Sequence, residues 1–412
     1  MRKNSVHKIL CLMTIIFTLI NTSPAENATA VKLGVEVLLE EKLDLVKGKR
    51  VGLITNPTGV SSRLESTIDL LCNHPDVELV ALFGPEHGVR GDVMAGEKIG
   101  NFVDKKTGVP VYSLYGKTRK PTPEMLKDVD VLIYDIQDIG SRAYTYIYSM
   151  AMGMEAAAEQ GKAFIVLDRP NPLGGNLIEG PVLDPEFKSF IGLYPIPFVY
   201  GMTVGELAQL FNKEFGINVD LSVVPLKGWE RNMTFEDTGL EWVITSPHIP
   251  HGKTALFCAA TGCIGELHTI DIGVGYTLPF ELVGEEWINA DEFAKELNSC
   301  NLPGVEFRPL HYRPYYFTRQ NAELQGVQIH IMDIEAFQPM RTQIYILSAI
   351  RKLYPNQKIF GTKRTGMFDK AMGTDQVRND IRKGKAPEKI IKSWQEDLKS
   401  FMKIREKYLL YK

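Results

Sequence analysis

The sequence lacks the motifs by which many nucleotide- and metal-dependent enzymes are recognised. Its 412 residues contain no GxGxxG after the first predicted strand, no GxxxxGK followed by Ser or Thr, and no GxSxG. His248 and His251 have a metal-like spacing, but the prolines beside them prevent a helix and no acidic third ligand lies close in the sequence. We therefore expect no metal and no nucleotide cofactor.

Long apolar runs are scarce as well. The run at 9–20 has twelve residues, fewer than the about 20 that span a bilayer, and no later segment reaches that length. It follows three basic residues and precedes small residues that end at Ala30, a pattern typical of a secretory signal peptide cleaved after Ala25 or Ala30. We expect residues 1–30 to be removed and the protein to be exported, either periplasmic or secreted, without stable membrane insertion.

Cysteine and positive charge are also limited. Four cysteines follow the signal segment, at spacings that match no common zinc site: Cys72, Cys258, Cys263 and Cys300. Because Cys72 and Cys258 lie in apolar stretches of a large chain, buried free thiols are favoured over disulfides. The net charge of −3 becomes −5 once the first 30 residues, with three basic and one acidic side chain, are removed. Nucleic acid is therefore not an expected partner.

The remaining residues are typical of a globular protein with two domains, since 44% are apolar and 24% charged. In the first half, strand and helix patterns alternate, which favours an α/β domain with a parallel, doubly wound sheet over residues 31–228. The predicted strands are 50–55, 77–83, 109–114, 131–135 and 163–168, and the predicted helices are 123–127, 141–160 and 203–215.

The pattern changes near Trp229 and indicates a smaller α/β domain over residues 229–412. This domain is predicted to contain a helix at 288–299, strands at 305–311 and 327–332, and amphipathic helices at 339–353 and 387–411.

Polar side chains follow the strands of the first domain. The glycine-broken loop 82–96, LFGPEHGVRGDVMAG, places Glu86, His87 and Arg90 directly after a buried strand, where ligands bind in open α/β sheets. The other strands are followed by Asn56, Asp135, Asp138 and Arg142. A solvated turn, or Asp and Asn capping the next helix, would explain part of this pattern. Glu86 and Arg142 are not favoured caps, and so they point more strongly to a site.

Together these motifs resemble one family, the exo-β-N-acetylmuramidases of bacterial peptidoglycan recycling, glycoside hydrolase family 171. The matching runs cover nearly the whole chain after residue 30 and include VGLITNPTGV at 51, LFGPEHGVRGD at 82, YDIQDIGSRAYTY at 134, LDRPNPLGG at 167, IEGPVLD at 178, GLYPIPFVYGMTVGELAQLFN at 192, PFELVG at 279 and GVQIHI at 326. The resemblance implies a Rossmann-like first domain, a smaller second domain and a cleft between them. It also implies release of N-acetylmuramic acid from the non-reducing end of a muropeptide or disaccharide, without metal or nucleotide.

Glycosidic cleavage requires a carboxylic acid to protonate the leaving oxygen, with a second group across the sugar ring. Glu86 occupies the position of the family's GPEHG glutamate and is the predicted general acid, while His87 would orient its carboxyl group or hold the sugar. The second group remains open between four side chains and the 2-acetamido group of the substrate. The four are Glu179, Asp135, Asp138 and Glu266.

The substrate's lactyl carboxylate suits a guanidinium, and Arg90 and Arg142 are the predicted donors. Asn56 is a further predicted contact, and Tyr146 would stack on the sugar unless it serves packing. Where the family commonly has GRGT, this chain has Val274 in place of the arginine. His268 is the predicted replacement donor if that arginine binds the carboxylate, and the alternative is a different aminosugar.

Two other classes of function stay open at this point. One is an exported protein that binds cell-wall sugars without turnover. The other is a hydrolase of a different bond, although an acyl-bond hydrolase would need an exposed nucleophile, and Cys72 on a predicted buried helix is a poor one.

Overall fold

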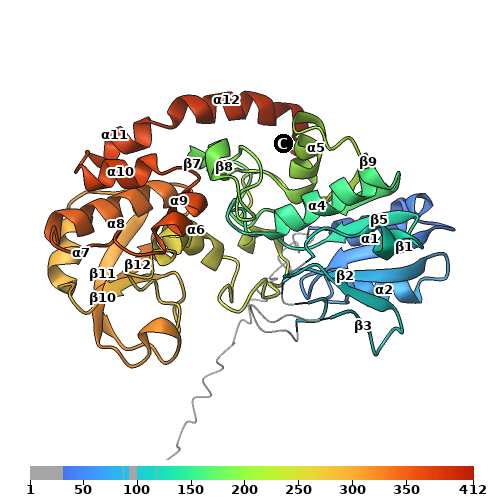
Figure 1. Cartoon of the computed structure of the whole chain (residues 1–412), viewed down its shortest axis with the longest axis horizontal. Coiled ribbons are helices and arrows are strands. Elements are labelled where there is room, and N and C mark those ends of the chain that lie inside the picture. Colours follow the sequence, from blue (N-terminus) through green and yellow to red (C-terminus); the bar gives the residue numbers. More distant parts are fainter. Residues whose placement is uncertain (1–30, 87, 92–99, 117) are drawn as a thin grey trace, which may run out of the picture.

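The computed structural model describes residues 31–86, 88–91, 100–116 and 118–412 and has two lobes bridged by the C-terminal helices (Figure 1). The first lobe contains a seven-stranded sheet in the order β3-β4-β2-β1-β5-β6-β9. All neighbouring strands are parallel except β3 and β4. The strands are β1 (Arg50–Thr55), β2 (Glu78–Gly84), β3 (Phe102–Val103), β4 (Pro110–Ser113), β5 (Val131–Asp135), β6 (Ala163–Leu167) and β9 (Asp220–Val224). The predicted α/β, Rossmann-like class is confirmed.

Helices cover both faces of this sheet, because its central strands are apolar on both sides. Strand β5 is buried along its whole length. On one face lie α1 (Gly34–Glu41) and α2 (Thr67–Asn73), and on the other lie α4 (Tyr146–Glu159) and α5 (Val204–Glu214). The short α3 (Pro123–Leu126) precedes β5.

The start of α5 follows its predicted capping pattern. The Thr203 hydroxyl accepts from the Glu206 amide, and the Glu206 carboxylate accepts from the Thr203 amide at 3.0 Å. Helix α4 starts later than predicted, at Tyr146. The preceding residues form turns, anchored by a bridge between Ser141 and Val199 and by the bond from the Arg142 amide to the Phe198 carbonyl.

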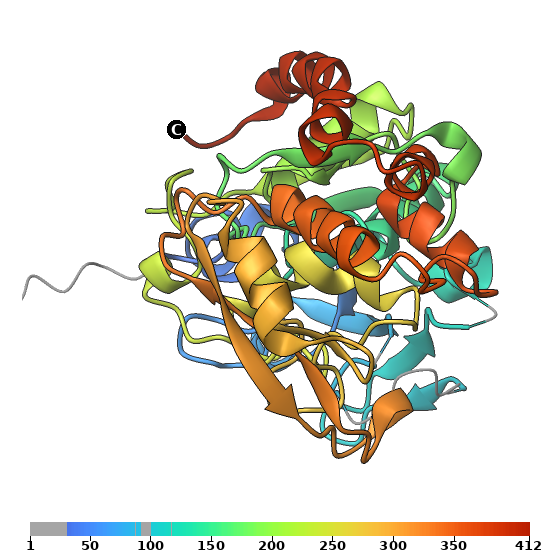
Figure 2. The same cartoon turned by 90° about the vertical axis from the view of Figure 1, so that its left-hand side faces the viewer.

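The second lobe is built on a three-stranded antiparallel sheet, which Figure 2 shows facing the viewer. Its strands are β10 (Leu282–Glu285), β11 (Val305–Tyr312) and β12 (Leu324–Ile331), with β12 in the centre. Helices α6 (Thr254–Gly265), α7 (Ala290–Asn298) and α8 (Pro339–Leu353) form its core with this sheet, and α9 (Thr365–Met372), α10 (Gln376–Arg382) and α11 (Pro387–Lys392) follow. A separate hairpin of β7 (Glu179–Val182) and β8 (Pro197–Val199) contacts α8 and α12.

The predicted single helix at 387–411 is broken into α11 and α12 (Gln395–Arg405). Helix α12 returns across the top of the molecule to the first lobe (Figure 1). There the Tyr411 hydroxyl donates to Asp168 at 2.5 Å, and the Arg231 amide donates to the Lys412 carbonyl at 2.9 Å. The last residues of the predicted second domain therefore pack against the first.

Two expectations from composition can be compared with the described part of the chain. Cys72, Cys258, Cys263 and Cys300 are free thiols, and burial raises the pKa of Cys258 to about 12. Within the described residues no helix is long and apolar enough to cross a membrane. The predicted signal segment 1–30 lies outside the described residues.

Candidate active site

Glu86 lies just beyond the carboxyl end of β2, and its side chain is half-buried. Asn56 follows the adjacent parallel strand β1, so both side chains start from the same sheet edge. Gly91 keeps the loop after β2 close to the turn after β1. It has a φ of +80°, and a Cβ atom there would lie 2.6 Å from the Pro57 ring.

Two tyrosines on different elements lie within electrostatic range of the Glu86 carboxyl group. Tyr115, just after β4, donates a hydrogen bond to Glu86, and burial together with this bond raises the pKa of Tyr115. Burial raises the pKa of Tyr146, which lies in the first turn of α4. The charges of Glu86 and Asp138 also raise this pKa, whereas Asn56 lowers it. Side chains that follow the four strands β1, β2, β4 and β5 therefore lie around the Glu86 carboxyl group.

The segment that leads into α6 also contributes to these surroundings. The Tyr146 hydroxyl donates to the Thr245 carbonyl at 2.9 Å, and the Tyr144 and Tyr146 rings meet edge to face at 5.1 Å. These contacts leave the Tyr146 ring almost fully buried, which assigns it to packing and positioning and argues against the predicted stacking on a sugar. The segment around Thr245, which leads into α6, thus reaches the edge of the sheet.

Asn56 and Asp138 each keep a hydrogen-bonding atom unused in the described part of the chain. The Asn56 oxygen accepts from the Thr58 amide at 2.9 Å and from its hydroxyl at 2.5 Å, while the Asn56 Nδ2 donor has no partner. Asp138 accepts from the Gly140 amide at 2.7 Å and from the Tyr200 hydroxyl through Oδ2, while Oδ1 has none. Burial raises the pKa of Asp138 to about 6. Buried polar atoms without partners call for water or a ligand.

Arg142 is wrongly predicted as a substrate contact. Its side chain is fully buried, and its guanidinium donates to the carbonyls of Pro181 and Ile196 at 2.8 Å each and of Ala371 at 3.0 Å. Burial lowers the pKa of Arg142 to about 10. Arg142 therefore joins the β7–β8 hairpin to α9 and does not reach the solvent.

Asp135 and Arg90 are also engaged in contacts within the protein. Asp135 is buried and paired with Arg169 at 2.6 Å across β5 and β6, and it accepts from the Thr67 hydroxyl at 2.5 Å. Arg90 pairs with Asp104 at 2.9 Å and with Asp69 at 3.2 Å. These pairs neutralise both candidates, so the structure does not favour a direct role for either one in catalysis or substrate binding.

Glu179 begins β7 and reaches toward the second lobe. Its carboxylate accepts from the Met340 amide at 2.9 Å, in the first turn of α8, where the N-cap residue Gln338 offers no side-chain bond. An anion at this end of a helix is stabilised by the free amides and the helix dipole. Burial raises the pKa of Glu179 to about 7. The geometry assigns Glu179 to a cap between the lobes in place of the predicted catalytic role.

Glu266 and His268 lie together in the second lobe, and neither is among the contacts of Glu86 described above. They line a cavity of about 170 Å³ in the second lobe, which Val274 and Arg319 also line. Glu266 pairs with Arg364 at 3.0 Å, and burial together with Arg364 lowers the pKa of His268. His268 and Val274 therefore share one cavity, as expected if His268 replaces the arginine that the family commonly has at the position of Val274. The remaining predicted residue, His87, lies outside the described residues.

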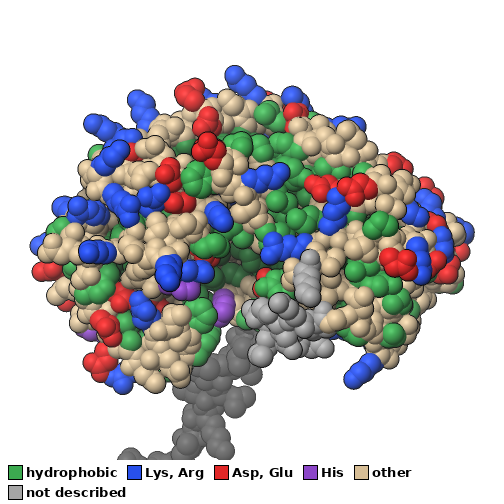
Figure 3. All heavy atoms as spheres, in the orientation of Figure 1, with side chains coloured by type: hydrophobic (Ala, Val, Ile, Leu, Met, Phe, Trp, Pro, Cys, Tyr) green, Lys and Arg blue, Asp and Glu red, His purple; other side chains and the backbone are tan. Residues whose placement is uncertain are grey.

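The surface is hollowed between the two lobes, with hydrophobic side chains inside and histidines at the margin of the second lobe (Figure 3). In the described part of the chain, no group of three or more His, Cys, Asp and Glu side chains is arranged to hold a metal ion. The arrangement around Glu86 instead offers a carboxylic acid, two phenols and an amide donor, which suits proton transfer to a polyol substrate.

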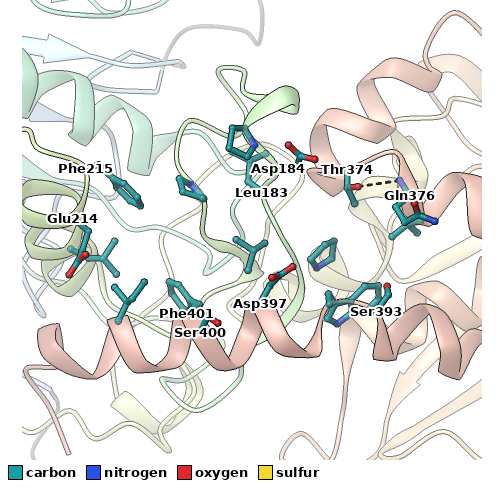
Figure 4. Close-up of a pocket in the computed structure, with 18 residues that line it drawn as sticks. Leu183, Asp184, Glu214, Phe215, Thr374, Gln376, Ser393, Asp397, Ser400 and Phe401 are labelled. Carbon is teal, nitrogen blue, oxygen red and sulfur yellow. Dashed lines mark hydrogen bonds between the residues drawn. The ribbon is translucent and has the colours of Figure 1, made fainter.

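A cavity of about 700 Å³ lies elsewhere, under α12 and beside the β7–β8 hairpin (Figure 4). Leu183, Phe215 and Phe401 form part of its apolar wall, and Asp184 and Asp397 contribute carboxyl groups. None of the predicted site residues lines it. We therefore place the reaction at the sheet edge.

Sequence reasoning missed Tyr115 and Thr245. Tyr115 follows the end of β4, so the rule that selected Asn56 and Glu86 would also have selected it. Thr245 contributes a backbone carbonyl from an irregular segment, and no side-chain pattern marks such a role.

Comparisons with known proteins identify the family of this chain. Residues 51–253 match the family described as "Exo-beta-N-acetylmuramidase NamZ, N-terminal", and residues 258–411 match its C-terminal counterpart. The peptidoglycan beta-N-acetylmuramidase NamZ of Bacillus subtilis is 51% identical over 399 residues, which cover 96% of each chain.

Two solved structures from Bacteroides fragilis, both titled DUF1343 family proteins, are similar over 93% of this chain and 99% of their own. One has a TM-score of 0.89 at 49% identity, and the other a TM-score of 0.72 at 30% identity. The predicted resemblance is confirmed: this chain belongs to the exo-β-N-acetylmuramidase NamZ family of glycosidases.

Proposed function

We propose that this protein releases N-acetylmuramic acid from the non-reducing end of peptidoglycan fragments, with Glu86 as the general acid. Near full-length similarity to a curated muramidase supports the reaction class. The observation that supports the assignment of Glu86 is its hydrogen bond with Tyr115 at the edge of the sheet, where Asn56 keeps an unused donor and Tyr146 lies within electrostatic range.

The surrounding groups explain how Glu86 would act. The Tyr115 hydroxyl holds the carboxyl group in one orientation, and partial burial shields it from water. A general acid must lie within hydrogen-bond reach of the leaving oxygen, so a fixed orientation reduces the ordering needed in the transition state.

We propose that the 2-acetamido group of the substrate supplies the second catalytic group. Among the four carboxylates considered, Asp135 and Glu179 are bound elsewhere, and Glu266 pairs with Arg364. Asp138 lies near Tyr146, but its unpaired oxygen is buried, which suits a positioning residue. Asn56 Nδ2 is placed in the same cluster as a donor for a substrate carbonyl.

Export is a further proposal, supported by the basic, apolar and small-residue order of residues 1–30. Cell fractionation of the full chain and of a chain lacking residues 2–30 tests it. The full chain is expected outside the cytoplasm in a shortened form, and an uncleaved cytoplasmic product would contradict export.

The test of the function compares a chromogenic β-N-acetylmuramide with the matching β-N-acetylglucosaminide, using the wild type and Glu86→Gln. We expect the wild type to prefer the muramide and Glu86→Gln to lose about 10²- to 10⁴-fold in kcat. Glu65→Gln, an exposed change in the same lobe, is the control. Equal rates for wild type and Glu86→Gln would overturn the role of Glu86.

A further inference from the structure

Three consecutive aromatic rings are exposed on the second lobe. Tyr315, Tyr316 and Phe317 are 60%, 46% and 55% exposed, in the loop between β11 and β12. Single exposed apolar residues need no explanation, but a contiguous patch of large rings marks an interaction site.

This loop is held in place by backbone bonds. The Tyr315 amide donates to the Gly275 carbonyl at 2.7 Å, and the Asn321 amide donates to the Pro314 carbonyl at 2.9 Å. The Tyr315 ring also stacks on Tyr276 at 5.4 Å. The exposure of the rings is therefore a fixed property of the fold.

Phe317 adopts a conformation that an aromatic residue rarely takes. Its φ is +67°, in the left-handed region, where a bulky side chain is strained by about 1–3 kcal/mol. The hydrogen bond from the Tyr315 amide to the Gly275 carbonyl holds the loop in this conformation. The loop packs so closely on Gly275 that a Cβ atom there would lie 2.4 Å from the Tyr316 carbonyl oxygen. Such strain concentrates where a ligand is held.

The aromatic loop is connected to the surroundings of Glu86 by the segment 245–248. The His248 ring lies 6.2 Å from the Tyr316 ring, nearly parallel to it, and 6.4 Å from the Phe317 ring. Three residues earlier, at most about 11 Å along the chain, the Thr245 carbonyl accepts from Tyr146. Because Tyr146 lies within electrostatic range of Glu86, the segment 245–248 joins the surroundings of Glu86 to the aromatic loop.

A cavity of about 170 Å³ adjoins the aromatic loop and shares Phe317 with it. Its apolar part is formed by Ile270, Ile272, Val274 and Phe280. The volume is below the about 300–1,000 Å³ of sites that enclose a drug-sized ligand, and it suits one ring or a part of it.

The charged groups around this cavity are paired or hydrogen-bonded, and the Asp271 carboxyl group that also lines it accepts from the Tyr312 hydroxyl at 2.7 Å and from the Gly273 amide at 2.8 Å. The Arg319 guanidinium pairs with Glu285 and donates to the His268 carbonyl at 3.2 Å, and Arg364 pairs with Glu266 at 3.0 Å. The Arg364 Nε–H is buried and has no partner among the described residues. Paired charges with a spare donor favour a neutral ligand rich in hydroxyl and amide groups over an ion.

We propose that Tyr316, Phe317 and the cavity beside Arg319 form a subsite for the neutral sugar that leaves when the terminal residue is cleaved. The proposal rests on the proposed function. The buried polar groups beside Glu86 suit the terminal sugar, whereas the exposed rings contact the part of the glycan that extends outward. Aromatic rings present flat apolar faces to the C–H face of a sugar, and Thr318 and Arg319, which line the cavity, carry donors for its polar groups.

The experiment compares two substrates that differ in the leaving group. One is a disaccharide in which N-acetylmuramic acid is linked to N-acetylglucosamine, and the other is β-N-acetylmuramyl fluoride, whose leaving group is a single atom. For Tyr316→Ala and Phe317→Ala we expect kcat/KM on the disaccharide to fall about tenfold each, within the range of one lost ring contact. The fluoride should react within about twofold of wild type.

Control variants separate stacking from damage to the fold. Tyr316→Phe and Phe317→Tyr keep the rings and should retain activity on both substrates, and Met332→Ala removes a side chain that is 70% exposed at the end of β12. Free N-acetylglucosamine should inhibit fluoride hydrolysis by wild type more strongly than by Phe317→Ala.

The outcomes distinguish the subsite from the function. Equal losses on both substrates, or no loss on the disaccharide, would overturn the subsite while leaving the reaction intact. A wild-type enzyme that hydrolyses neither muramide substrate would instead refute the proposed function.

Discussion

The Tyr115 hydroxyl, just after β4, donates a hydrogen bond to the carboxyl group of Glu86, just after the neighbouring strand β2. Tyr115→Phe removes this bond and keeps the ring. Because the carboxyl group loses its fixed orientation, we expect kcat to fall by about 5- to 20-fold with KM nearly unchanged, the loss of about one hydrogen bond. Steady-state kinetics measure both constants. Tyr112→Phe on β4 is the control, and a change confined to KM would contradict an orienting role.

Arg142 is expected to act on stability. Arg142→Met leaves three buried carbonyl oxygens without their donor, at a cost of about 3 kcal/mol in the free energy of unfolding. Urea unfolding measures this loss, and exposed Arg308→Met is the matched control. If Arg142 bound the substrate carboxylate, the folded variant would instead show a raised KM at nearly normal stability.

Asp168 makes the stability depend on pH. Burial raises its pKa to about 7, against about 3.9 in an unfolded chain. The folded state therefore holds the proton more tightly, so the stabilisation from this group is complete below about pH 4 and is lost as the pH rises through about 7. Neighbouring Glu206 acts in the same direction.

We expect the melting temperature of the wild type to fall between pH 5 and pH 8. Asp168→Asn should flatten that decline, because its amide does not titrate. Differential scanning calorimetry across this range measures both. An equally steep decline in the variant would assign the dependence to other groups, such as Asp138.

A substitution at Glu179 tests whether this residue caps α8 or takes part in catalysis. Glu179→Gln retains an oxygen that accepts from the Met340 amide but loses the negative charge at the start of α8, which costs about 0.3–1 kcal/mol. We expect kcat within about threefold of wild type. A loss of about 10³-fold in a folded Glu179→Gln variant would identify Glu179 as the second catalytic carboxylate.

Participation of the acetamido group is tested on the substrate. Replacing its methyl group by trifluoromethyl withdraws electrons from the carbonyl oxygen and makes it a poorer nucleophile. We expect kcat on the trifluoroacetamido muramide to fall by at least about tenfold. A rate equal to that of the natural substrate would indicate a carboxylate from the protein.

The fold could be predicted well from the sequence because its signals are local. Strand β5 begins and ends where its apolar run does, and α8 begins at the proline and ends at the leucine expected. The cap on α5 depends on two residues three positions apart. Such features require no knowledge of distant parts of the chain.

The site was less predictable because proximity to a strand end does not decide which way a side chain points. Asp135 and Asp138 follow the same strand, yet Asp135 pairs with Arg169 from β6 and Asp138 turns toward Tyr200. Arg142 was predicted to contact a ligand because arginine is not a favoured helix cap. In the structure its guanidinium donates to three carbonyl oxygens from separate segments. The rings at 315–317 show no periodic pattern at all.

The return of α12 to the first lobe means that the polypeptide crosses between the lobes both before α6 and again near its end. Two lobes that are also connected by α12, on the side opposite the cleft, can rotate relative to one another only through a small angle. The end of a glycan would therefore enter a cleft of almost constant width. Loss of the bond between Tyr411 and Asp168 would make the width of that cleft more variable, although neither residue touches a reacting atom.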